Sequence, residues 1–136
     1  MSSSASSSRG LVGPLVVAGL CDLIALVVFV AIGRRSHDEA GSVTGFLTTL
    51  WPFLIGAAIG WAVAYAFTRS DVFLPSRIVP SGVVIWVSTV IVGMILRVVS
   101  GQGTAVSFIV VATIATGVLL VGWRALAAFS EARRSR

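Results

Sequence analysis

The fold is decided by the stretch LVGPLVVAGLCDLIALVVFVAI, Leu11 to Ile32, in which Asp22 is the single charged residue. An α-helix rises about 1.5 Å per residue, so about 20 apolar residues cross the roughly 30 Å hydrocarbon core of a bilayer. The apolar core of a signal peptide is shorter, at about 7 to 15 residues. We therefore expect this stretch to be a transmembrane helix that stays in the mature protein.

Three further apolar stretches follow in the 136-residue chain, over residues 43–67, 81–99 and 104–124. Inside a bilayer no water satisfies backbone groups, so a spanning segment must be a helix or a barrel strand, and the alternation typical of a barrel strand is absent. Hydrophobic residues make up 57% of the chain, charged residues 11%, and the mean hydropathy is +1.02. These values predict an all-α integral membrane protein, a four-helix bundle with up-down-up-down topology.

The transmembrane domain is predicted to cover residues 11–124. The Ser-rich segment 1–10 is low in complexity and is expected to be a disordered tail. Residues 125–136 form a basic C-terminal tail, and its end, Glu131 to Arg136, is expected to prolong the last helix.

Arginine carries all ten basic charges, and its distribution predicts the orientation in the membrane. Seven arginines flank the span ends on the side of the membrane that holds the N-terminus, and three flank the span ends on the other side. Arg34 and Arg35 belong to those three and oppose the trend, because they follow the first span directly. The positive-inside rule then predicts a plasma-membrane protein with both termini in the cytoplasm.

The net charge of +5 does not indicate nucleic-acid binding, because the basic residues are spread over short flanks and form no basic domain. Anionic membrane lipids are the expected partners of such flanks. The single cysteine, Cys21, cannot form an internal disulfide, and the single histidine, His37, has no metal-ligand spacing around it. We expect no metal and no cofactor.

Small residues indicate how the helices pack, because helices in lipid associate through close van der Waals contact and interhelical hydrogen bonds. In the second span, Gly56 and Gly60 form a small-xxx-small pair on one helix face. Helix contacts are expected at Gly56, Gly60, Gly93 and Gly117.

Asp22 should face protein or water, because an aspartate at the centre of a spanning helix costs about 2.5–3.5 kcal/mol on insertion scales. If the first and third helices run the same way, Asp22 lies near the depth of Thr89, and Trp86 is a second candidate donor. One interpretation makes Asp22 a proton, cation or substrate site. The other, which we favour, makes it a structural group that locks the first helix to the third.

The connections after the first and third spans emerge on the same side and carry a second set of polar residues. Arginine forks suit phosphate or carboxylate, so a lipid headgroup or a small anion could bind there. Alternatively, the arginines only extend to the interface, the turn is an ordinary tight hairpin, and the histidine is a solvated loop residue rather than a proton relay. The set, which we call the arginine mouth, consists of Arg34, Arg35, Ser36, His37, Arg97, Ser100 and Gln102.

Four short motifs resemble those of a family of actinobacterial membrane proteins known as domain of unknown function 3054. They are FVAIGRRSH (Phe29–His37), WPF (Trp51–Phe53), GMILRVVSGQGTAVSF (Gly93–Phe108) and GWR (Gly122–Arg124). The resemblance covers about Leu15 to Arg124. It implies a multi-pass plasma-membrane protein from an actinobacterium, and it brings no assigned activity, cofactor or catalytic residue.

The favoured function is a non-enzymatic accessory or assembly component that binds another membrane protein or a second copy of itself. Two alternatives use Asp22 and the arginine mouth: an oligomeric small carrier or channel, and a protein that binds anionic lipid or a small anion. A lipid-acting enzyme is a remote alternative, because the sequence has no paired carboxylates, nucleophile–base set or metal motif.

Overall fold

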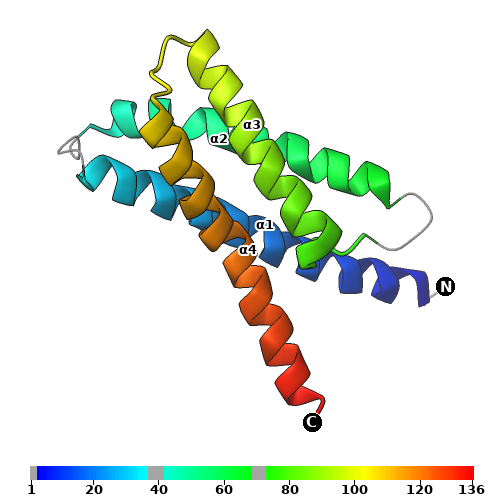
Figure 1. The fold of residues 1–136 in the computed structure, drawn as a ribbon. Coiled ribbons are helices and arrows are strands. Elements are labelled where there is room, and N and C mark those ends of the chain that lie inside the picture. Colours follow the sequence, from blue (N-terminus) through cyan, green and yellow to red (C-terminus); the bar gives the residue numbers. More distant parts are fainter. Residues whose placement is uncertain (1–2, 37–41, 69–72) are drawn as a thin grey trace.

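The computed structural model describes residues 3–36, 42–68 and 73–136, with residues 3–11 and 35–36 described by their backbone alone. The described residues contain no strand and four long α-helices (Figure 1). All four helices are long and apolar enough to cross a membrane, which confirms the predicted all-α bundle. The elements are α1 (Ser3–Ser36), α2 (Val43–Phe67), a short kinked turn η1 (Ile78–Gly82) in which Val79 is extended, α3 (Val83–Val99) and α4 (Val106–Arg134).

The helix bounds differ from the expected ones mainly at the chain ends. The predicted span 43–67 coincides with α2, and α4 continues past the span 104–124 to Arg134, as expected for a tail that prolongs the last helix. Helix α1 begins at Ser3, so in the structure it includes most of the segment 1–10 that was expected to be disordered. Extending an existing helix adds one hydrogen bond for each residue that is ordered, so a helix formed in the bilayer can continue into a serine-rich segment.

Five threonines inside the spans satisfy their hydroxyl groups within their own helix. In α2 and α3, Thr48, Thr49 and Thr89 each donate to a backbone carbonyl four residues earlier, as Thr49 does to Gly45 at 3.0 Å and Thr89 to Ile85 at 2.6 Å. Thr113 and Thr116 make the same bond in α4. A hydroxyl paired in this way carries little cost in an apolar environment, so these spans remain compatible with a bilayer.

Helices α2 and α3 touch through their backbones. A Cβ atom added to Gly56 would lie 2.9 Å from Thr89 Cα, and one added to Gly60 would lie 2.8 Å from Ile85 Cα. At the same contact the Ser88 hydroxyl donates to the Gly56 carbonyl at 2.7 Å. The absence of a side chain at the two glycines is therefore what allows this close approach.

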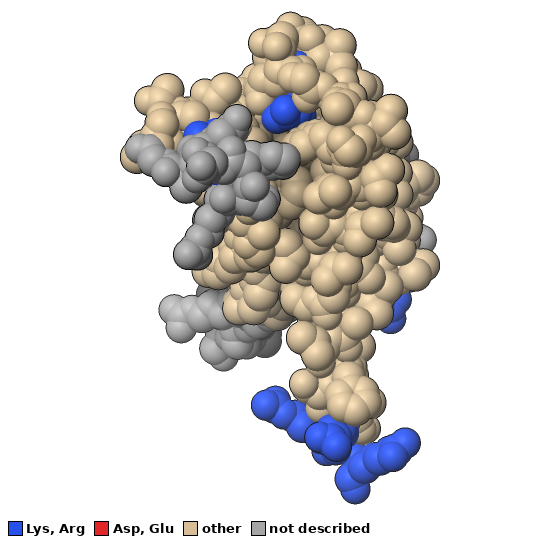
Figure 2. Space-filling model, turned by 60° about the vertical axis from the view of Figure 1, so that its left-hand side comes forward, with Lys and Arg blue, Asp and Glu red and all other residues tan. Residues whose placement is uncertain are grey.

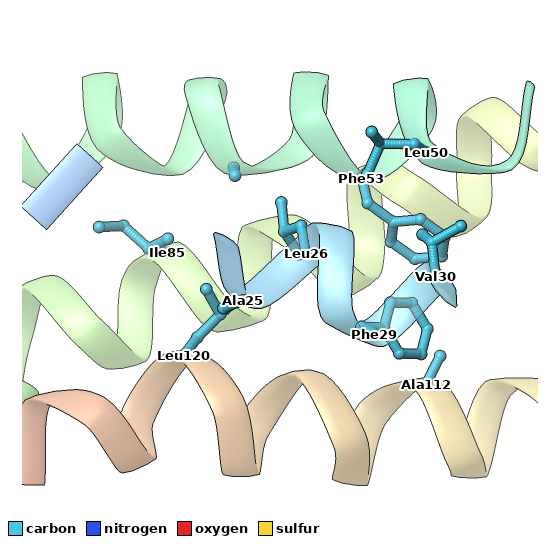
Figure 3. Packing of buried hydrophobic residues seen from close by; sticks show 10 residues of the cluster. Ala25, Leu26, Phe29, Val30, Leu50, Phe53, Ile85, Ala112 and Leu120 are labelled. Atoms are coloured by element: carbon cyan, nitrogen blue, oxygen red, sulfur yellow. The ribbon is translucent and has the colours of Figure 1, made fainter. Parts of the chain in front are cut away.

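Aromatic rings cover the remaining glycines that were expected at helix contacts. The Phe53 ring lies against Gly93, and the Trp86 ring lies against Gly117. Phe53 also meets Phe29 edge to face, with ring centroids 5.2 Å apart. Figure 3 shows Phe29 beside Ala112 of α4, so one apolar core joins all four helices.

The outside of the bundle is apolar over most of its height. In Figure 2 an uncharged band lies between the arginines near the top and those lower down, at the right-hand edge and at the projecting end of α4. Exposed side chains within the spans include Ile24, Ile91 and Val118. A surface of this kind suits contact with lipid, and the charges at its two ends suit the headgroup layers.

The α2–α3 contact predicts that Gly60→Ala destabilises the protein. The added methyl would meet the Ile85 backbone, and overpacking of this kind costs about 1–3 kcal/mol. Thermal unfolding in detergent measures the effect. Gly19→Ala in α1 is the matched control, because a Cβ there has no neighbour within 4 Å. Equal melting temperatures for both variants would contradict the close approach.

Candidate functional site

A buried ion pair connects the first helix to the last. Asp22 of α1 and Arg124 of α4 are 3% and 0% exposed. The two Nη atoms of Arg124 each donate to one oxygen of Asp22, Nη1 to Oδ1 at 2.7 Å and Nη2 to Oδ2 at 2.8 Å. This bidentate geometry is the strongest form of an arginine–carboxylate contact.

Two indoles and two backbone carbonyls complete the coordination of the pair. Trp61 of α2 donates to Asp22 Oδ2, and Trp123 of α4 donates to Oδ1, both at 2.8 Å. Arg124 in turn donates to the carbonyls of Pro75 and Leu120, each at 2.8 Å. Among the described residues no buried side-chain nitrogen or oxygen lacks a partner. We call these side chains, Asp22, Arg124, Trp61 and Trp123, the charge centre.

Small residues make room for the charge centre. Ala18 and Ala25, which lie one helical turn before and after Asp22, are both buried. A Cβ atom on Gly82 would lie 2.7 Å from Arg124 Cδ, so the start of α3 needs glycine for the arginine side chain to pass. The charge centre therefore involves α1, α2, α4 and the segment that leads into α3.

Trp86 and Thr89, the hydrogen-bond donors that the sequence predicts for Asp22, are wrong. Trp86 donates to the Thr113 carbonyl at 2.9 Å, and Thr89 donates to Ile85 of its own helix. Thr89 is buried in the bundle, but a position along a helix does not determine which neighbour the helix faces. Asp22 thus links α1 to α4 and α2 rather than to α3.

The sequence does not mark Arg124 as the partner of Asp22, because Arg124 follows an apolar stretch, where an arginine ordinarily extends to the membrane surface. The isolated aspartate was itself a useful signal, since an ionised carboxylate inside a span commonly pairs with a cation. In the structure both oxygens of Asp22 accept bonds from Arg124 and from an indole. This arrangement favours a structural role for Asp22 over a proton or ligand site.

A pocket of about 590 Å³ lies where α1 ends and α4 begins. We call this side of the molecule the pocket end. The polar part of the lining includes both Arg34 and Arg97. The full lining comprises Phe29, Val30, Gly33, Arg34, Thr49, Arg97, Gln102, Gly103, Ala105, Ser107, Phe108 and Val111.

Defined contacts orient the two arginines of the pocket. Arg34 Nη1 donates to the Thr49 hydroxyl at 3.2 Å. Arg97 donates to Gln102 Oε1 at 2.9 Å and to the Gly103 carbonyl at 3.1 and 2.8 Å, and its guanidinium stacks 4.3 Å from the Phe108 ring centroid. The connection between α3 and α4 therefore holds Arg97 at the pocket wall.

The structure brings together part of the residue set expected at the arginine mouth. Arg34, Arg97 and Gln102 line the pocket, and Ser100 lies beside it, where it accepts a hydrogen bond from Gln102 Nε2 at 3.2 Å. The side chains of Arg35 and Ser36, and all of His37, lie outside the described residues.

Four apolar residues of the pocket lining could not be recognised from the sequence. Phe29, Val30, Phe108 and Val111 carry no sequence signal that separates them from ordinary core or lipid-facing residues. Within the described part of the chain, no group of three or more metal-ligating side chains occurs. The pocket thus combines two arginines with an apolar wall.

Comparison with known proteins identifies a family. The family described as "Protein of unknown function (DUF3054)" matches residues 19–127, a region that contains the charge centre and the whole pocket. No curated protein and no solved structure matches the chain.

The ion pair predicts strong coupling between Asp22 and Arg124. Asp22→Asn leaves a buried guanidinium without its counter-charge, and such a loss costs about 3–5 kcal/mol. Asp22→Asn and Arg124→Gln should therefore each lower the melting temperature and the abundance of the protein. The double variant should be less destabilised than the sum of the two, because it removes both charges.

Thermal unfolding of the two single variants and the double variant in detergent measures this coupling. Arg133→Gln is the control, since Arg133 is exposed near the end of α4. Additive effects, or an Asp22→Asn protein as abundant and stable as the wild type, would contradict a structural ion pair.

Proposed function

The chain belongs to the DUF3054 family, and we propose that it acts without catalysis, as a plasma-membrane protein that binds a phosphate or carboxylate group at Arg34 and Arg97. The observation that carries the proposal is the position of both guanidiniums on the wall of one pocket. Planar guanidinium forks match the geometry of these two anionic groups.

The electrostatics of the pocket support an anionic ligand. Two arginines, Arg34 and Arg97, contribute positive charge to the described lining. Thr49, Gln102 and Ser107 add uncharged polar groups to the same lining. A concave site with a few convergent polar groups and an otherwise apolar lining is typical of ligand binding.

The chemistry of the lining supports binding rather than catalysis. Thr49 and Ser107 bring hydroxyl groups to the lining, but the described lining offers no histidine, lysine or carboxylate that would activate either as a nucleophile. The pairing of Asp22 with Arg124 counts against the carrier or channel alternative, because Arg124 occupies the carboxylate that this alternative invoked.

An accessory role is a second proposal, which the exposure of α4 favours. The span in α4 is the least buried of the four, and its exposed residues include Val110, Ile114 and Val118. Such a helix offers a face to another membrane protein or to a second copy of this chain.

We further propose that both termini are cytoplasmic, because Arg133, Arg134 and Arg136 lie at the tail of α4.

Anion binding is tested with phosphatidylglycerol and inorganic phosphate as probes, and phosphatidylcholine as the neutral comparison. At least one anionic probe should raise the melting temperature of the wild-type protein in detergent. Arg34→Gln with Arg97→Gln should lower the affinity about tenfold or more, because each hydrogen bond to a charged group contributes about 1.5–3 kcal/mol.

Arg77→Gln is the matched control, since Arg77 is exposed and does not line this pocket. It should leave the affinity unchanged. The proposal fails if neither anionic probe stabilises the protein, or if the double variant and the wild type respond alike.

A further inference from the structure

We propose that the ligand of the pocket is an anionic amphiphile with one acyl chain, which enters from the lipid between α1 and α4. Its head group binds at Arg34 and Arg97, and its chain lies along the apolar wall, which we define as Phe29, Val30, Phe108 and Val111. This inference rests on the proposed function and names the class of its ligand.

The pocket extends from the membrane boundary into the hydrocarbon region. Phe29 lies five residues before Arg34, where the first candidate span ends, and Val111 lies five residues after Val106, where the fourth begins. Five helical residues correspond to about 7–8 Å along the helix axis. The arginines are thus at the boundary, while the apolar wall reaches the depth of acyl chains.

The exposure of the wall residues indicates a lateral entrance. Phe29 and Val30 are buried, at 6% and 2% exposed, whereas Val111 is 60% exposed although it lines the same pocket. A residue that is both pocket wall and outer surface marks the place where the pocket meets the surroundings. Because Val111 lies within a span, those surroundings are lipid.

The size and lining of the pocket favour an amphiphile over a free anion. A volume of about 590 Å³ falls in the range of about 300–1,000 Å³ that holds a drug-sized ligand. A phosphate ion would occupy the arginine end and leave the apolar wall without contacts. A head group with a single chain contacts both parts.

Arg97 and Phe108 mark the boundary between the two parts. Their stacking, together with the bonds from Arg97 to Gln102 and Gly103, fixes the guanidinium beside the first ring of the apolar wall. A head group bound to Arg97 therefore has its chain directed along Phe108. Such a preorganised arrangement reduces the ordering cost of binding.

The experiment compares three probes by native mass spectrometry of the full-length protein in detergent. Myristoyl lysophosphatidic acid and glycerol 3-phosphate share a phosphate head and differ in the chain, and phosphatidylglycerol has two chains. The lysolipid should bind at least tenfold more tightly than glycerol 3-phosphate, because each buried methylene contributes about fourfold in affinity. It should also bind more tightly than phosphatidylglycerol.

Val111→Trp narrows the apolar wall and should lower the lysolipid affinity at least fivefold while leaving glycerol 3-phosphate binding unchanged. Val118→Trp is the matched control, because Val118 is an equally exposed valine of α4, at 66%, outside the pocket. Retained glycerol 3-phosphate binding also shows that the Val111→Trp protein is folded.

The outcomes separate this inference from the proposed function. Equal affinities for the lysolipid and glycerol 3-phosphate, tighter binding of phosphatidylglycerol, or equal effects of the two tryptophan variants would overturn the one-chain ligand while anion binding stands. If no probe binds to the wild type, both proposals fail.

Discussion

A charge buried inside a bilayer is costly unless an opposite charge pairs with it, and in this protein Asp22 of the first helix pairs with Arg124 of the last. A buried ion pair gains little free energy over well-packed apolar residues, but an arrangement that leaves either charge without its partner costs several kcal/mol. The pair therefore acts mainly on specificity. It disfavours any packing in which α1 and α4 are separated, and the indole of Trp61 adds α2 to the same arrangement.

The rest of the bundle can be understood from this constraint together with one more contact. Gly56 and Gly60 bring α2 against α3, and Arg124 reaches the segment before α3 through the Pro75 carbonyl. The four helices are thus joined around the charge centre. At the pocket end, where α1 finishes and α4 starts, the space between the helices is lined by Arg34 and Arg97. The protein therefore uses arginine in two ways, once as a buried structural cation and twice on the wall of a pocket.

The sequence predicts the number of spans, because hydropathy and length alone decide what can cross a bilayer. It also indicates that Asp22 is buried, since a carboxylate facing lipid is too costly. It cannot predict the partner. Thr89 and Trp86 satisfied the depth argument as well as any other polar residue, but the choice among neighbouring helices depends on how all four pack, and Arg124 has the sequence context of a surface arginine. The apolar wall of the pocket could not be predicted for a similar reason, because Phe29 and Val111 differ from ordinary bundle residues only in what surrounds them.

The most direct test of this account is the ¹H–¹⁵N spectrum of the tryptophan indoles in the wild type and in Asp22→Glu, which keeps the charge but moves the carboxylate. The four indole signals are assigned with single Trp→Phe variants. The signals of Trp61 and Trp123 should shift, because their N–H groups donate to Asp22, and the signal of Trp86 should stay in place, because its N–H donates to the Thr113 carbonyl. A shift of Trp86 with Trp61 and Trp123 unchanged would contradict the charge centre.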